Sequence, residues 1–347
     1  LGDGAVGDRR IMSETTAAKM HARAFGHDPR IPGLALGFFE KSSHGLRIIG
    51  HSGDTQWFHT DLALVPSENV GVFVSYNTDT GGPQSRAALP FLRRFLDHYY
   101  PTQPPPLRAR AHASIKAKQV AGEYRFNRMS YTTFQKAFGL IGAVTIRANT
   151  DGSLRMLSPL GDMRLLPVGP LLYREELGTE MVAFEADGSR RASHGFVGSL
   201  PMLALERVPW SQSAQLHWII LGGAVVIFAA VARAALERLI RGRRDGPLAR
   251  GDLPGRSFIV SLALAHLSFV VTFVLIMADS IATMPQSSTA LRIALALPVV
   301  GAALTVLAAA AAVRHWTNGW GTRAARIRYD AVVVVALLFI WSLSQWN

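Results

Sequence analysis

The sequence predicts a chain in three parts: a mixed α/β (α+β) domain, a small antiparallel β-domain and an α-helical bundle of four membrane spans. Short apolar runs separated by turn residues predict the strands of the first two parts. Four long apolar segments toward the end of the 347 residues predict the bundle. A mean hydropathy above zero agrees with a membrane protein better than with one large soluble core.

Residues 1–100 are expected to form two helices around a sheet. Ser13 can cap a helix that runs to about Arg23, because its hydroxyl can accept a hydrogen bond from the first turn. Residues 66–69, Pro-Ser-Glu-Asn, form a turn between two apolar runs and predict a hairpin. Apolar side chains at helical spacing over residues 85–99 predict a helix that packs on the sheet. The expected strands cover residues 34–40, 46–52, 57–65 and 70–76.

A proline-rich segment marks the first domain boundary, and we expect a stiff linker over residues 101–117. Residues 118–209 then carry short β-like runs at a spacing of roughly 10 residues, which favours a small antiparallel barrel or sandwich with an accessory role. Asp151-Gly152 and Asp187-Gly188 are expected to be hairpin turns. The expected strands cover residues 122–126, 144–148, 154–157, 164–168, 171–174, 181–185 and 202–207.

Residues 210–347 are expected to form a membrane domain, because about 20 apolar residues suffice to cross about 30 Å of hydrocarbon. Arginines gather between the first and second spans and between the third and fourth, whereas residues 279–289 contain no Lys or Arg. The positive-inside rule then places both arginine-rich loops in the cytoplasm. We therefore expect a multi-pass protein of the cytoplasmic (inner) membrane, in contact with the lipid bilayer, with residues 1–210 outside or in the periplasm. The spans lie near residues 218–236, 258–278, 290–313 and 331–346.

The composition argues against several other functions. Charged residues make up only 17%, yet the net charge is +12. Because the arginines lie beside apolar segments rather than in a basic motif, no nucleic-acid partner is expected. The absence of cysteine excludes disulfides, thiolate metal sites and a cysteine nucleophile. Histidines are dense near the beginning of the chain but show no metal-ligand spacing, so no metal and no cofactor are expected.

The motif Gly50-His51-Ser52-Gly53 lies between two apolar runs and is typical of an active-site strand. Glycine lets a substrate carbonyl approach the backbone closely. The imidazole of His51 can polarise a substrate group or transfer a proton. A structural histidine at the end of a strand and an ordinary strand hydroxyl for Ser52 are the alternatives.

Together with Gly37-Phe38-Phe39-Glu40 and the run from Pro66 to Asn77, this motif resembles the C-terminal portion of the serine β-lactamase-related hydrolases. That family includes penicillin-binding proteins, class C β-lactamases, esterases and D-aminopeptidases, and its third motif is Lys-Thr-Gly or His-x-Gly. The resemblance implies that His51 occupies the position of the motif's lysine. It further implies that Ser52 offers a hydroxyl to the substrate, that Gly53 gives steric access, and that the backbone N–H of Asp54 is one oxyanion-hole donor.

The family's Ser-x-x-Lys nucleophile motif and its Tyr-x-Asn motif precede this strand, and the sequence contains no Ser-x-x-Lys. We therefore expect the chain to be the C-terminal fragment of a longer, membrane-anchored serine hydrolase, inactive by itself. The resemblance implies an acyl-enzyme mechanism on a small-molecule or peptidoglycan-like peptide substrate: D-amino-acid peptides, β-lactams or small esters. The alternative is a non-catalytic envelope-binding or sensor protein that retains the fold.

Overall fold

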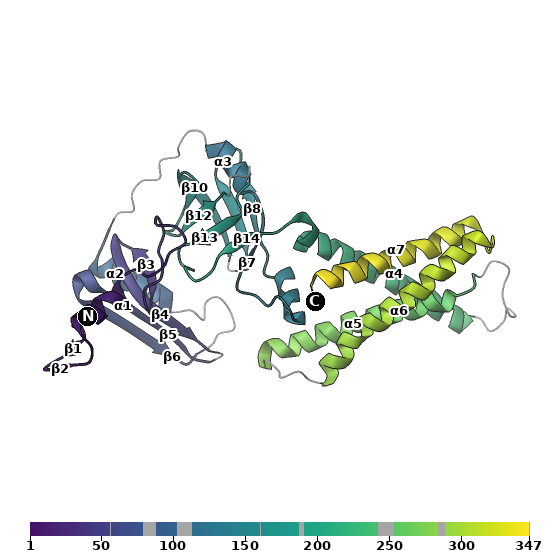
Figure 1. Ribbon diagram of the computed structural model, residues 1–347, viewed down its shortest axis with the longest axis horizontal. Helices are drawn as coiled ribbons and strands as arrows, with labels where there is room; N and C mark the ends of the chain where they lie inside the picture. Colours follow the sequence, from purple (N-terminus) through teal and green to yellow (C-terminus); the bar gives the residue numbers. More distant parts are fainter. Residues whose placement is uncertain are drawn as a thin grey trace. The chain divides into compact units, whose positions relative to one another are not determined.

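The computed structural model describes residues 1–55, 57–78, 88–102, 113–159, 161–186, 191–241, 253–283 and 289–346. The chain divides into two compact units (Figure 1). Unit 1 contains Leu1–Met129 and Ile141–Pro209, and unit 2 contains Ser130–Leu140 and Trp210–Asn347.

Unit 1 opens with a short hairpin, β1 (Ala5–Val6) and β2 (Arg9–Arg10), followed by helix α1 (Glu14–His21). The Ser13 hydroxyl accepts a hydrogen bond from Thr16 N at 3.1 Å, which confirms the predicted cap. An antiparallel sheet of order β3-β4-β5-β6 follows, with helix α2 (Ala88–Tyr99) packed on one face. Its strands are β3 (Phe39–Ser43), β4 (Leu46–Asp54), β5 (His59–Val65) and β6 (Val70–Tyr76), with the 3-10 turn η1 (Pro66–Glu68) in the predicted hairpin.

The prediction for the first strand of this sheet was largely wrong. Leu34 forms only isolated bridges, to Phe25 and Phe39, and the strand begins at Phe39. Gly37 has φ +82°, and Ala35 N donates to Phe38 O at 2.9 Å, so the chain turns where a continuous strand was expected. A second turn, closed by Thr55 N and Phe58 O, delays the start of β5 to His59.

The second part of unit 1 is a closed antiparallel barrel of eight strands. Strand β13 was not predicted, because Gly195 interrupts its apolar pattern; a Cβ there would lie 3.0 Å from the Phe184 ring. Asp151-Gly152 forms the expected turn between β8 and β9, whereas Asp187-Gly188 lies outside the described residues. The strands are β7 (Gly122–Phe126), β8 (Val144–Ala148), β9 (Leu154–Ser158), β10 (Gly161–Gly169), β11 (Leu172–Glu175), β12 (Met181–Glu185), β13 (His194–Val197) and β14 (Leu205–Arg207).

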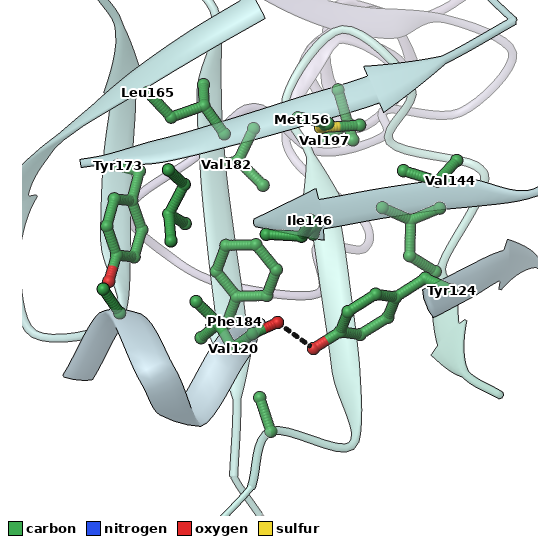
Figure 2. Packing of buried hydrophobic residues seen from close by; sticks show 14 residues of the cluster. Val120, Tyr124, Val144, Ile146, Met156, Leu165, Tyr173, Val182, Phe184 and Val197 are labelled. Carbon is green, nitrogen blue, oxygen red and sulfur yellow. Dashed lines mark hydrogen bonds between the residues drawn. The ribbon is translucent and has the colours of Figure 1, made fainter. Parts of the chain in front are cut away.

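Helix α3 (Ala113–Val120) packs against the barrel core. Ala117 and Val120 are fully buried, and Tyr124 OH donates to Val120 O at 2.8 Å (Figure 2). Residues 113–117, assigned to the linker from the sequence, thus begin a helix whose Ala117 and Val120 side chains join the core. The proline-rich part of the linker, residues 103–112, lies outside the described residues.

Unit 2 contains the 3-10 turns η3 (Phe134–Leu140) and η4 (Trp210–Gln212) and the helices α4 (Ala214–Arg241), α5 (Arg256–Thr283), α6 (Thr289–Thr317) and α7 (Arg323–Gln345) (Figure 1). Each of the four helices contains a stretch long and apolar enough to cross a bilayer. This confirms a membrane-embedded chain. Helix α7 begins eight residues before the predicted span, because Thr322 caps it by accepting a hydrogen bond from Ala325 N.

Candidate active site

Strand β4, which carries the motif Gly50-His51-Ser52-Gly53, has one backbone edge that is only partly paired. Strand β4 pairs with β5 as far as Asp54↔His59, but its pairing with β3 ends at Phe39↔Gly50. Along His51–Asp54, the side of β4 that faces β3 therefore has no strand partner among the described residues. Free N–H and C=O groups on such an edge can pair with an extended peptide.

His51 lies on this edge with its side chain exposed to solvent. Its Nδ1 is 2.8 Å from Ser52 O, and its ring stacks on Phe39 at 4.5 Å between centroids. Because a carbonyl oxygen can only accept, Nδ1 carries the hydrogen. Nε2 is then the ring nitrogen that remains for a ligand, and stacking on Phe39 restricts the ring plane.

Ser52 is oriented differently from His51. The register pairs Ser52 with Asp61 and His51 with Leu62, so the two motif side chains lie on opposite faces of the sheet. Ser52 Oγ donates to Asp61 Oδ1 at 2.7 Å, and Lys41 Nζ is 3.0 Å from the same oxygen. Ser52 therefore belongs to a buried ion-pair cluster on the α2 face.

Gly53 and Asp54 end the strand. A Cβ on Gly53 would lie 2.8 Å from Thr60 Oγ1, whereas one on Gly50 would collide with the backbone carbonyl of Leu62. Gly50 is therefore the glycine that the close approach of β5 requires. The Asp54 carboxylate is 2.8 Å from Nδ1 of buried His59, leaving the Asp54 backbone N–H as the predicted donor.

A buried carboxylate supports the strand from the other side. Glu40, 2% exposed, pairs with Arg23 and Arg47 and accepts from Gly33 N at 3.0 Å. Burial alone would raise the pKa of Glu40, but the hydrogen bonds from Arg47, Gly33 and Arg23 together lower it. Glu40 stays ionised and ties the segment before β3 to β4. Sequence reasoning missed this role, because it depends on the turn that brings Arg23, 17 residues before Glu40, and Arg47, seven residues after it, to the same carboxylate.

The hairpin tip beside the motif is apolar. Trp57 is 59% exposed and Phe58 is 58% exposed, so neither ring packs in the sheet, although both fall within the predicted strand 57–65. Both lie in the turn that follows Asp54. Exposed aromatic side chains next to an open strand edge can contact an apolar part of a ligand.

A separate hollow of about 220 Å³ lies on the barrel side of unit 1, and none of the four motif residues lines it. His27 stacks there on Phe196 at 4.6 Å. Burial and the neighbouring His194 lower the pKa of His27, while Glu185 acts in the opposite direction. Among the described residues, no group of three His, Asp or Glu side chains is arranged to hold a metal ion.

Comparison with known proteins does not assign the chain to a family. No protein family matches the sequence, and no curated protein matches it. Two solved structures share partial similarity, both at 16% identity. A crystal structure of SurE with D-Leu has a TM-score of 0.35 over 60% of this chain and 48% of that one; a crystal structure of SurE has a TM-score of 0.34 over 57% and 43%. The chain thus spans less than half the length of either.

Proposed function

We propose that unit 1 carries the substrate-binding strand of a membrane-anchored serine hydrolase related to the β-lactamases. It would act on amides or esters such as D-amino-acid peptides, β-lactams or small esters. The arginine-rich loops would lie in the cytoplasm and unit 1 outside the cytoplasmic membrane. The nucleophile would come from a Ser-x-x-Lys motif that this sequence does not contain.

The observation that carries the proposal is the open edge of β4 with exposed His51 upon it. An extended acyl substrate can pair with this edge and bring its carbonyl beside the backbone N–H of Asp54. Trp57 and Phe58 lie within a few residues of the edge and are exposed enough to contact an apolar substituent.

The proposed reaction has two steps. The serine oxygen attacks the carbonyl carbon, the hydroxyl proton passes to a base, and the bond to the amine or alcohol breaks as that leaving group takes a proton. Water then attacks the ester and releases the acid and the serine hydroxyl. The Asp54 N–H would stabilise the oxyanion, where one lost donor costs about 3 kcal/mol. His51 Nε2, exposed and without a partner in the described structure, would orient the substrate or transfer a proton to the leaving group.

The test uses the natural protein in its own membranes. We expect a fluorophosphonate or penicillin probe to label one serine, and His51→Gln to lower kcat/KM for an ester or D-amino-acid peptide by about 10²–10⁴. His98→Gln is the matched control, because His98 is exposed on α2. If the probe labels no serine, or if turnover is unchanged in the His51 variant, the proposal of a hydrolase is wrong.

A second candidate is a non-catalytic envelope protein that binds peptides along the same edge. One observation favours this candidate. The Ser52 hydroxyl donates its hydrogen bond to Asp61, so the serine of the motif is already engaged within the protein. Peptide binding that weakens in His51→Gln, in a protein that no serine probe labels, would support this candidate over the enzyme.

A further inference from the structure

The segment Ser130–Leu140 follows strand β7 and precedes strand β8, yet it belongs to unit 2. Trp218 Nε1 of α4 donates to Leu140 O at 3.1 Å. The Phe134 ring meets Phe273 of α5 edge-on, at 6.4 Å between centroids. The chain therefore passes from the barrel strands to the membrane helices at this segment, and again at Trp210.

Both contacts lie inside the apolar stretches of the helices. Trp218 is four residues beyond the start of the Ala214–Ile240 stretch, and Phe273 is three residues before the end of Arg256–Ile276. At 1.5 Å per residue, Trp218 lies about 6 Å and Phe273 about 5 Å inside the ends of these apolar stretches, while helix α5 itself continues to Thr283. The segment thus reaches the depth at which bilayer headgroups meet acyl chains.

Two partly exposed aromatic side chains of the segment suit that depth. Tyr131 is 49% exposed and Phe138 is 41% exposed. Aromatic rings concentrate at membrane–water interfaces, because one part of the ring is apolar and its edge or hydroxyl tolerates water. The segment also carries Lys136 and no Asp or Glu, and a lysine can extend its amine toward phosphate groups.

Hydrogen bonds and helix contacts fix the backbone of the segment. Ser130 Oγ lies 2.7 Å from Thr133 Oγ1, and Lys136 N donates to Thr133 O at 2.9 Å. These bonds start the 3-10 turn η3, which is anchored at Phe134 and Leu140 by the helices. A turn that is already fixed in this way loses little conformational freedom on entering lipid.

We propose that Ser130–Leu140 is a lipid-binding element, which inserts Tyr131 and Phe138 into the interfacial layer of the bilayer at the end of the bundle where α4 begins. The occupant of this apolar surface is lipid rather than a second protein, because the surface continues that of helices that already lie in the bilayer. The barrel is then attached to the membrane through its β7–β8 connection as well as through α4.

The absence of cysteine in the sequence makes a direct test simple. The full chain would be reconstituted in phosphatidylcholine–phosphatidylglycerol vesicles with a nitroxide on Phe138→Cys or, separately, on Tyr131→Cys. Collision rates would be measured with oxygen, which partitions into lipid, and with a polar nickel chelate, which does not. Leu177→Cys is the matched control, because Leu177 is an apolar residue of the barrel that is 89% exposed.

We expect the ratio of oxygen to nickel collisions at both test positions to exceed that at position 177 by at least about threefold, as lipid contact predicts. A ratio equal to that at 177 would place the segment in water and overturn the proposal. Low collision rates with both reagents would show that protein covers the segment, which would also overturn it. Both replaced side chains are exposed, so neither variant removes core packing.

Discussion

Ser52 Oγ lies 2.7 Å from Asp61 Oδ1, on the face of the sheet opposite to His51. The adjacent residues His51 and Ser52 therefore have different roles. His51 faces solvent beside an open strand edge, whereas Ser52 completes the hydrogen bonding of a carboxylate that is 4% exposed. Asp61 also pairs with Lys41, so the cluster joins strands β3, β4 and β5.

From this geometry we expect Ser52→Ala to weaken the fold. The substitution removes one hydrogen bond to a buried charge, and the expected loss is about 1–2 kcal/mol in the free energy of unfolding. Chemical denaturation of the purified chain, followed by the fluorescence of unit 1, measures the change. Ser42→Ala, an exposed serine of β3, is the control and should stay within about 0.5 kcal/mol of the parent. Equal stability of the two variants would contradict the role given to Ser52.

The sequence predicted those features that depend on neighbouring residues. The Ser13 cap, the turn before β6 and the apolar stretches of the four helices are all local signals, and the structure has them. Strand β13 and the start of β3 were missed, because glycine positions there serve ring packing or a turn. The membership of Ser130–Leu140 in unit 2 depends on contacts with residues more than 70 positions away.

The candidate site shows the same difference between features set by neighbouring residues and features set by the fold. The strand that carries His51 agrees with the prediction, because an apolar run ending in Gly-His-Ser-Gly is a local pattern. The orientation of Ser52 depends on its pairing with Asp61, and a register shift of one residue would have turned it to the other face. The ion pairs of Glu40 likewise required the fold to bring Arg23 and Arg47 together.

Asp151 should make the barrel sensitive to acid. Hydrogen bonds from Ser153, together with Arg164, lower the pKa of Asp151 from 3.8 to about 2. A lowered carboxyl pKa adds stability above the unfolded value of 3.8, and this contribution is lost as the pH falls toward 2. We expect Asp151→Asn to lower stability near neutral pH by about 1 kcal/mol or less, because the carboxylate is half exposed.

Unfolding midpoints measured between pH 2 and pH 7 test this expectation. The difference between parent and Asp151→Asn should shrink as the pH falls. Asp162→Asn provides the control, because the described residues give the Asp162 side chain an exposed ion pair with Arg155, at 3.1 Å. A difference that is constant with pH would show that the charge of Asp151 is not responsible.

The loop between Phe25 and Leu34, which contains His27, should be held against Phe196 less firmly at low pH. Burial and the nearby His194 lower the pKa of His27 below 6.5, with Glu185 opposing them. The unfolded segment therefore binds protons more readily, so docking is favoured above pH 6.5 and weakens as the pH falls below it. We expect faster amide exchange at Ala24, Phe25 and Leu34, whose backbone bonds close the loop, at low pH.

His27→Phe separates charge from packing, because phenylalanine can keep the ring stacked on Phe196 but cannot titrate. Hydrogen exchange of the variant, corrected for intrinsic rates, should lose its pH dependence at those three amides. If the parent and the variant change equally with pH, another group controls the loop.

His266 is a polar residue in the apolar core of the bundle. Its side chain is fully buried, and neither ring nitrogen has a hydrogen-bond partner in the described part of the chain. The ring lies between Phe228 and Phe339, at 5.3 and 4.7 Å. It also fills the space beside Gly301, where a Cβ would lie 2.7 Å from Nδ1. An unpaired polar group in such a core costs about 1–3 kcal/mol.

Replacement of His266 by leucine should therefore stabilise the bundle by about 1–2 kcal/mol, because it removes the unpaired nitrogens while keeping most of the packing. Gly301→Ala should destabilise it, since the added methyl group meets the imidazole. The pair His266→Ala and Gly301→Ala should be less harmful together than the sum of the two alone, because the first makes room for the second. Unfolding in mixed micelles at increasing SDS gives all three values. A bundle weakened by His266→Leu would show that the imidazole has a stabilising partner and would mark it as a binding site within the membrane.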